Sequence, residues 1–228
     1  MKIVITANGE LTAERLRAAL PVRPDLLIAA DGGVAPLLAA GLRPDILIGD
    51  FDSAPAQAVE FCRMNGVSVL PYPAEKDETD LELALNQADE ILRRAGAAAG
   101  TAEILLLGAG GGRTDHLMAN LALMLNWARR GRRVRMLNQA EECWVAGSGR
   151  EEITGAAGVL LSILPMSAEA KLSCRGLRYP LRRQILRQDS PRGVSNLMLG
   201  ARAEVEIHSG WILLVKTNAA GLPEADRK

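Results

Sequence analysis

Short apolar segments and longer amphipathic segments alternate along the first 138 residues. The apolar segments lack a strict apolar–polar alternation, which is typical of strands covered on both faces. They predict strands at residues 3–6, 26–30, 46–48, 67–70, 104–107 and 134–137. The segments between them have the period of a helix and predict helices at residues 11–20, 34–40, 56–65, 80–95 and 115–130. This order predicts an α/β domain with a mainly parallel sheet covered by helices, and a ligand site at the carboxyl ends of the strands.

The pattern changes after Asn138. Short β-type segments separated by turns predict strands at residues 143–146, 159–164, 170–174, 203–208 and 211–217. The turn at residues 208–211 predicts a β-hairpin, and no segment there has the period of a helix. We therefore expect an α/β domain at residues 1–138 and a smaller all-β sandwich domain at residues 139–228.

Composition and charge disfavour proteins that bind nucleic acid or a membrane. Lysine plus arginine equals aspartate plus glutamate, at 27 each, so no net field attracts nucleic acid or an acidic membrane. Cys62, Cys143 and Cys174 are far apart and are typical of reduced thiols in a cytoplasmic protein. No apolar run approaches the ~20 residues of a membrane span, and the N-terminus turns polar too soon for a signal peptide. We expect a cytoplasmic protein without a nucleic-acid or membrane partner.

Two carboxylates, Asp50 and Asp52, follow the predicted strand at residues 46–48. If the backbone stays extended there, both side chains project to one side. Two like charges about 4 Å apart repel by about 4 kcal/mol at an effective dielectric constant of about 20. A cation between them relieves this repulsion, and Mg²⁺ binds carboxylates together with substrate phosphates. The alternative is a polar turn in which the aspartates cap the next helix.

Polar clusters follow two further strands. Asp31, Gly32 and Gly33 end the second strand, where bare glycines let a ligand approach the backbone; the alternative is a tight turn capped by Asp31. Residues 76–80 precede the fourth helix. A Thr79–Glu82 capping box explains part of this segment and leaves the aspartates there unexplained. Its candidate phosphate- and metal-binding residues are Lys76, Asp77 and Asp80.

A glycine-rich segment, residues 108–112, follows the fifth strand and contains four glycines in five positions. It matches neither the Walker P-loop nor the dinucleotide fingerprint. A phosphate cradle that includes Gly110 and Gly111, with Arg113 as a charged clamp, fits the segment, and Asp115 is a helix cap or a metal ligand. His116 and His208 are the only histidines, which disfavours a zinc site or a Ser–His–Asp triad.

The four motifs taken together are specific. ADGG at 30–33, GDFDS at 49–53, KDETD at 76–80 and GGGRTDH at 110–116 have the order and spacing seen in thiamine pyrophosphokinases, and the chain resembles a bacterial member of that family. The C-terminal part is similar more loosely, through residues 173–181 and Ser195–Asn196. The resemblance implies transfer of a diphosphoryl group from ATP to the hydroxyl of thiamine, giving thiamine diphosphate and AMP. It also implies a homodimer in which the β-sandwich completes the thiamine site.

The resemblance also implies residue roles. Asp50, Asp52 and Asp80 would hold Mg²⁺, and Asp31, Arg113 and Asp115 would lie around the nucleotide and its phosphates. Ser195 and Asn196 would face thiamine, with Trp211 as the candidate for the aromatic residue that contacts it. Either Asp80 or Asp115 would accept the proton of the alcohol.

Three alternative functions are open. A strand followed by D-x-D also occurs in haloacid-dehalogenase-like phosphatases, where Asp50 or Asp52 would be the nucleophile. The second alternative is a non-catalytic nucleotide sensor with the same fold. The third is a related diphosphokinase acting on another alcohol, such as a hydroxymethylpterin.

Overall fold

The computed structural model describes residues 1–97, 102–138 and 140–217. The chain divides into two compact units. The first, called the α/β unit, comprises residues 1–123 and 130–139; the second, called the β unit, comprises residues 124–129 and 140–228. Residue 139, where the predicted β domain begins, and residues 218–228 lie outside the described residues.

The α/β unit contains a parallel sheet with the strand order β6-β5-β1-β2-β3-β4. The six predicted strands of this region are present, each within a residue or so of its expected bounds. They are β1 (Lys2–Thr6), β2 (Leu26–Ala30), β3 (Ile46–Gly49), β4 (Ser68–Pro71), β5 (Glu103–Leu107) and β6 (Arg133–Leu137).

Helices connect these strands, as the sequence predicts. They are α1 (Ala13–Ala19), α2 (Val34–Ala39), α3 (Ala56–Met64), α4 (Asp80–Arg94) and α5 (Thr114–Arg129), with a single 3₁₀ turn, η1 (Asp31–Gly33), before α2. The first helix is shorter than expected because Thr12 caps it, with its side chain accepting from the Arg15 amide. Thr79 caps α4 in the same way, accepting from the Glu82 amide at 3.2 Å, so the predicted cap is confirmed.

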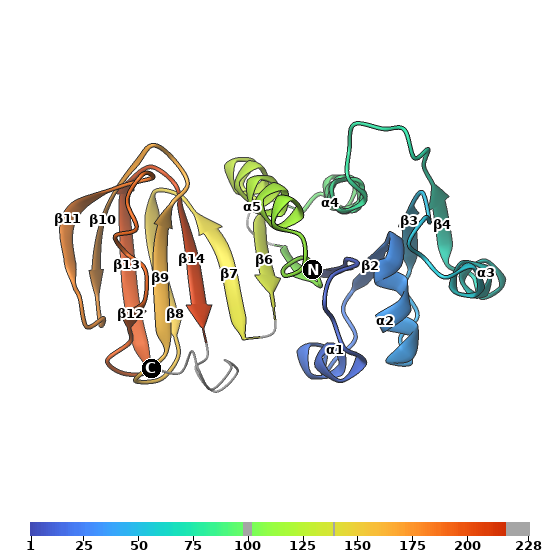
Figure 1. The fold of residues 1–228 in the computed structure, drawn as a ribbon, viewed down its shortest axis with the longest axis horizontal. Coiled ribbons are helices and arrows are strands. Elements are labelled where there is room, and N and C mark those ends of the chain that lie inside the picture. Colours follow the sequence, from blue (N-terminus) through green and yellow to red (C-terminus); the bar gives the residue numbers. More distant parts are fainter. Residues whose placement is uncertain (98–101, 139, 218–228) are drawn as a thin grey trace. The chain divides into compact units, whose positions relative to one another are not determined.

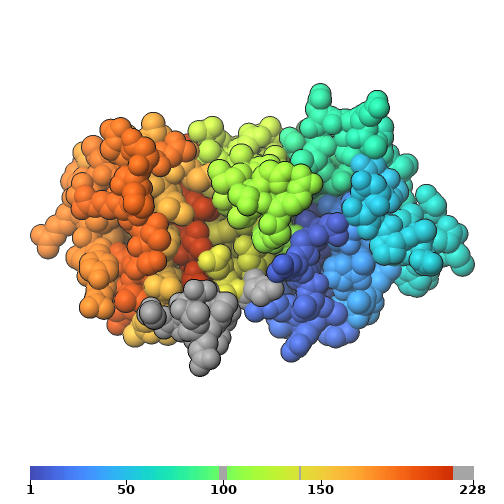
Figure 2. Space-filling view, viewed as in Figure 1, coloured from blue at the N-terminus to red at the C-terminus, as the bar shows by residue number. Residues whose placement is uncertain are grey.

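The two faces of the sheet are covered by different helices. Alternate residues of a strand point to opposite faces, and Val4, Leu27 and Leu47 pack in one buried cluster with side chains of α1, α2 and α3. Helix α4 contacts β1, β2 and β3 from the other face. In the space-filling view, the N-terminal residues, coloured blue, form a closely packed surface (Figure 2). In the view of Figure 1, α4 lies above the strands of this sheet and α1 and α2 lie below them. Because the six strands are parallel, every strand-to-helix loop leaves the sheet at its carboxyl edge.

The β unit contains two antiparallel sheets packed face to face. The first has the order β12-β9-β14-β7 and the second the order β11-β10-β13-β8. Buried side chains from both, including Leu161 and Leu214 of the first and Leu172 and Val205 of the second, form one core cluster. The strands are β7 (Glu141–Ala146), β8 (Gly149–Thr154), β9 (Leu160–Pro165), β10 (Glu169–Arg175), β11 (Leu181–Arg187), β12 (Asn196–Leu197), β13 (Arg202–Ser209) and β14 (Ile212–Thr217). The predicted α/β domain followed by an all-β sandwich is confirmed.

Two details of the β unit differ from expectation. The sequence did not predict β8, β11 or β12, because β8 and β11 each bury a single side chain, Ile153 and Leu186, and β12 has two residues. The predicted hairpin at 208–211 is wrong: β13 pairs with β10 and β8, whereas β14 pairs with β7 and β9. The turn therefore carries the chain from one sheet to the other, with Gly210 at φ +85°.

No helix among the described residues has the length and apolar character needed to cross a bilayer.

Candidate functional site

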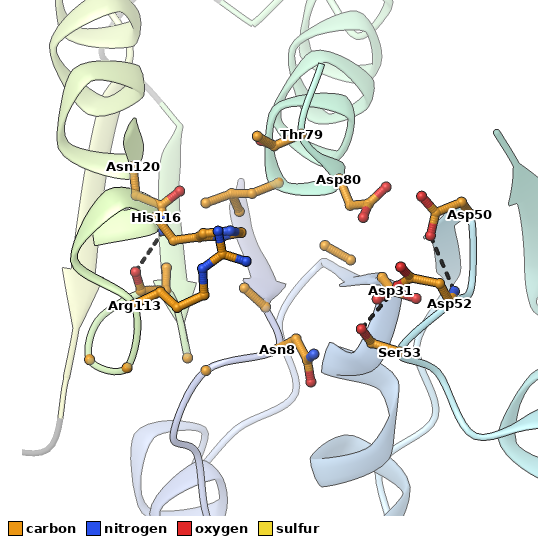
Figure 3. A pocket seen from close by; sticks show the side chains of 18 of the residues that line it. Asn8, Asp31, Asp50, Asp52, Ser53, Thr79, Asp80, Arg113, His116 and Asn120 are labelled. Atoms are coloured by element: carbon orange, nitrogen blue, oxygen red, sulfur yellow. Dashed lines mark hydrogen bonds between the residues drawn. The ribbon is translucent and has the colours of Figure 1, made fainter. Parts of the chain in front are cut away.

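A cavity of about 530 Å³ lies at the carboxyl edge of the parallel sheet. This is within the size range of small-molecule sites. Its lining comes from loops that follow β1, β2, β3, β4 and β5 and from the N-terminal halves of α4 and α5 (Figure 3). The polar side chains among the lining residues are Asn8, Asp31, Asp50, Asp52, Ser53, Lys76, Thr79, Asp80, Arg113, His116 and Asn120.

Three carboxylates lie together in this cavity. Asp31, Asp50 and Asp52 each offer an oxygen atom, and these atoms lie within 4.8 Å of one another. Asp31 is 5% exposed, and its Oδ1 atom is buried without a hydrogen-bond partner among the described residues. Burial raises the pKa of the Asp31 carboxyl above its ordinary value. An unpartnered buried oxygen beside two further carboxylates fits a hard divalent cation, which prefers oxygen ligands.

Backbone turns, rather than an extended strand end, bring these carboxylates together. Phe51 has φ +66°, so the segment from Asp50 to Asp52 is not extended as the sequence analysis assumed. The Asp52 amide donates to Asp50 Oδ1 at 3.1 Å, and Ser53 Oγ donates to Asp52 Oδ1 at 2.9 Å. Asp31 also has a left-handed backbone, with φ +45°. Non-glycine residues rarely adopt this conformation, and it is often found at functional sites.

Lys76 links Asp80 to this group. Lys76 Nζ lies 2.8 Å from Asp50 Oδ2 and 3.2 Å from Asp80 Oδ1, and the lysine side chain is only 10% exposed. The hydrogen bond between Lys76 and Asp50 raises the pKa of the lysine and lowers that of the carboxyl. Burial raises the pKa of Asp80. Asp80 lines the same cavity, but it is outside the group formed by Asp31, Asp50 and Asp52.

The glycine-rich segment forms another wall of the cavity. Gly108, Gly111 and Gly112 have φ values of +67°, +83° and +66°, which side-chain-bearing residues adopt only with strain. Position 110 requires glycine for a different reason: a Cβ atom there would lie 2.0 Å from Asn138 Oδ1. The Gly9 amide donates to the Gly108 carbonyl at 2.8 Å, which ties this segment to the loop after β1.

Arg113 and Asp115 are paired at the start of α5. Arg113 Nη2 lies 2.5 Å from Asp115 Oδ2, and Arg113 Nε donates to Asp115 Oδ1 at 3.1 Å. The guanidinium lowers the pKa of the Asp115 carboxyl to about 2. Arg113 lines the cavity and projects, with His116, from the side opposite the aspartates (Figure 3).

Several predicted site residues do not line the cavity. Over the described residues, the lining does not include Gly32, Gly33, Asp77, Gly110 or Asp115. Conversely, the cavity is also lined by residues that the sequence pattern did not indicate, among them Asn8, Gly9, Ser53 and Asn120. Asn8 and Gly9 follow β1 at the same sheet edge. The expectation of a ligand site at the carboxyl ends of the strands was therefore sufficient to indicate them. Asn120 lies inside α5, where an isolated asparagine gives no signal.

The candidate thiamine residues lie in the β unit. Asn196 is buried, and its side chain holds the backbone of Tyr179: Oδ1 accepts from the Tyr179 amide at 3.0 Å and Nδ2 donates to its carbonyl at 2.8 Å. Ser195 is exposed and has φ +58°. The Trp211 ring packs on Gly147, where a Cβ atom would lie 2.7 Å from the ring.

Known proteins resemble the chain over nearly its whole length. The family described as thiamin pyrophosphokinase, catalytic domain, matches residues 20–136, and that described as thiamin pyrophosphokinase, vitamin B1 binding domain, matches residues 151–212. Thiamine pyrophosphokinase of Bacillus subtilis is 27% identical over 194 residues, covering 84% of this chain and 87% of that protein.

Solved structures show the same fold. The thiamin pyrophosphokinase of Geobacillus thermodenitrificans superimposes with a TM-score of 0.79 at 29% identity, covering 97% of this chain and 100% of that one. The Bacillus subtilis structure gives a TM-score of 0.81 at 24% identity, covering 96% and 99%. The chain belongs to the thiamin pyrophosphokinase family.

Proposed function

We propose that the protein transfers the diphosphoryl group of ATP to the hydroxyl of thiamine, giving thiamine diphosphate and AMP. The observation that supports this most is the grouping of Asp31, Asp50 and Asp52 in one cavity, in a chain that matches both family domains. Phosphoryl transfer depends mainly on positioning and on compensation of the phosphate charge, and a cavity lined by these groups provides both.

The carboxylates of Asp31, Asp50 and Asp52 are the proposed ligands of Mg²⁺, and Asp80 lies beside them. The unpartnered buried Asp31 oxygen supports this choice because a buried carboxylate oxygen is costly unless a cation or donor satisfies it. When bound, Mg²⁺ would offset negative charge on the phosphate oxygens of ATP.

The charged residues around this group act on the phosphates and on the attacking hydroxyl. The hydroxyl oxygen of thiamine attacks the β-phosphorus, the bond from that phosphorus to the α–β bridging oxygen breaks, and AMP leaves. Lys76 and Arg113 supply positive charge for the phosphates. Asp80 is the proposed acceptor of the hydroxyl proton because it lines the cavity, whereas Asp115 is held by Arg113 outside it at a pKa of about 2 and is a weak base.

The two units have different proposed roles. The α/β unit binds the nucleotide and the metal ion, and the β unit provides Ser195, Asn196 and Trp211 for thiamine. We also propose a homodimer. The β unit exposes the large side chains of Tyr179 and Leu199, which are candidates for the contact. Sedimentation equilibrium of the purified chain tests the dimer, and a monomer at micromolar concentration contradicts it.

The test of the reaction is AMP release in the presence of ATP and Mg²⁺, measured with thiamine, with a hydroxymethylpterin and without an acceptor. We expect AMP only with thiamine. AMP release with the pterin alone supports the related diphosphokinase, and no AMP release with any alcohol supports a nucleotide sensor. Inorganic phosphate release together with a trapped aspartyl-phosphate supports the phosphatase.

Asp52→Asn tests the carboxylate assignment. The substitution removes one charge from an exposed side chain, so the fold should persist while turnover is almost abolished. Circular dichroism and thermal unfolding report the fold, and AMP release reports turnover. Near-normal activity dependent on ATP and Mg²⁺ in this variant contradicts the assignment.

A further inference from the structure

Asn120 is a buried polar residue of α5 that the reaction described above does not use. It is 8% exposed and lines the cavity, and its Nδ2 donates to the carbonyl of Ala109 at 2.7 Å. Ala109 lies within the glycine-rich segment, residues 108–112. Because the partner is a carbonyl oxygen, only the NH₂ group of the side chain can make this bond, which defines the orientation of the amide.

We infer that Asn120 is a positioning residue, which holds the glycine-rich segment in the conformation that binds the polyphosphate of ATP. This inference rests on the proposed function, because it concerns the nucleotide side of the same cavity.

The glycine-rich segment needs external restraint. Glycine loses more backbone freedom on ordering than any other residue, and three of the four glycines here are held at positive φ. Two hydrogen bonds with residues outside the segment restrain it. The Gly9 amide binds the Gly108 carbonyl at 2.8 Å, and Asn120 binds the next carbonyl, that of Ala109.

These two bonds orient two consecutive peptide groups. In a trans peptide, the C=O and the following N–H point in opposite directions. Binding of the Gly108 carbonyl therefore directs the N–H of Ala109, which lines the cavity. Binding of the Ala109 carbonyl fixes the peptide group that leads into Gly111 and Gly112, which also line it. Backbone N–H groups are the donors with which glycine-rich loops hold phosphate oxygens. Asn120 thus acts on the ligand through the loop.

The amide suits this position for a second reason. An ionised aspartate at residue 120 accepts hydrogen bonds only, so it could not bind the Ala109 carbonyl. It would also add negative charge to a cavity already lined by Asp31, Asp50, Asp52 and Asp80. A neutral donor restrains the loop without repelling the phosphates.

The test compares two ligands on Asn120→Ala and on the wild-type chain. The probes are α,β-methylene-ATP, in which the bond that breaks in the reaction is replaced, and AMP, which lacks the transferred group. Binding is measured by titration calorimetry with Mg²⁺. We expect Asn120→Ala to weaken α,β-methylene-ATP about tenfold, the effect of losing about 1.4 kcal/mol, and AMP by less than about twofold. Hydrogen exchange of residues 108–112 should become faster.

Asn65→Ala is the matched control. Asn65 Nδ2 donates to the Phe61 carbonyl at 2.8 Å, and Asn65 does not line the cavity. Its loss should change thermal stability and leave the ratio of the two affinities unchanged. Asn120→Asp keeps the shape of the side chain, so it provides the test if the alanine variant does not fold, and we expect at least as large a loss.

The outcomes separate the two hypotheses. If the wild-type chain binds α,β-methylene-ATP and the Asn120 variants bind it equally well, the inference about Asn120 fails alone. Equal weakening of both ligands also overturns it, because that result indicates a general structural role. If the wild-type chain binds neither nucleotide, the proposed function itself fails.

Discussion

Lys76→Met tests whether the stability of the metal-free protein depends on the positive charge of Lys76 in the cavity. Methionine keeps most of the apolar stem of the side chain and removes the cation that lies 2.8 Å from Asp50 and 3.2 Å from Asp80. The three side chains are 10%, 13% and 24% exposed, so water replaces the ammonium group incompletely. The variant leaves these carboxylates beside Asp31 and Asp52 without the lysine.

The structure sets the size of the expected effect. A hydrogen bond to a charged group contributes about 1.5–3 kcal/mol. Lys76 makes one such bond to Asp50, and its ion pair with Asp80 adds to the stabilisation. Part of the lost free energy is regained in the variant, because both carboxylates keep partial contact with solvent and can take up protons. We therefore expect the free energy of unfolding of the metal-free protein to fall by about 3 kcal/mol. For a chain of this size that corresponds to a decrease in Tm of about 6–12 °C.

The assay is thermal unfolding in EDTA and again at increasing Mg²⁺. Mg²⁺ should raise the Tm of Lys76→Met more than that of the wild-type chain, because the ion can neutralise the carboxylates that lysine no longer pairs. A ligand at 100 times its Kd contributes about 2.7 kcal/mol, which nearly offsets the loss.

Lys216→Met is the control for this experiment. Lys216 Nζ lies 2.7 Å from Glu142 Oε2 in the β unit, and both side chains are largely buried. This variant should also be destabilised, but Mg²⁺ should not restore it selectively. The reasoning is refuted if the Tm of Lys76→Met in EDTA lies within about 2 °C of wild type, or if Mg²⁺ restores both variants equally.

Three further predictions concern single residues. Burial raises the pKa of Asp31, so the metal-free protein loses stability as pH rises from the ordinary pKa of 3.8 through the folded-state value. Asp31→Asn should remove this loss, adding about 0.5–2 kcal/mol at pH 7 in chemical denaturation, and should lower turnover. Thr79→Ala should cost about 1 kcal/mol of unfolding free energy by loss of the α4 cap, and an unchanged urea midpoint would contradict this. Gly33→Ala places a Cβ atom 2.2 Å from the Thr6 carbonyl and should cost at least about 1–3 kcal/mol. Gly200→Ala, which meets no atom within 4 Å, should change stability by less than about 0.5 kcal/mol.

Local signals in the sequence predicted much of the α/β unit. The uninterrupted apolar strands indicated a sheet covered on both faces, and the capping threonine at position 79 marked the start of α4. Because strands of a parallel sheet end at one edge, the motifs after three of them were expected in one place, and Asp31, Asp50 and Asp80 do line one cavity. These features depend on neighbours along the chain, which is why pattern and spacing were sufficient.

The pairing of charges in the cavity was decided only by the tertiary structure. The turn at Phe51, the position of Lys76 between two carboxylates and the pairing of Asp115 with Arg113 all depend on differences of a few ångströms. The same is true of β13 and β14, adjacent in sequence but placed in different sheets. Such distances result from packing between elements far apart in the chain, and a one-dimensional pattern contains no measure of them.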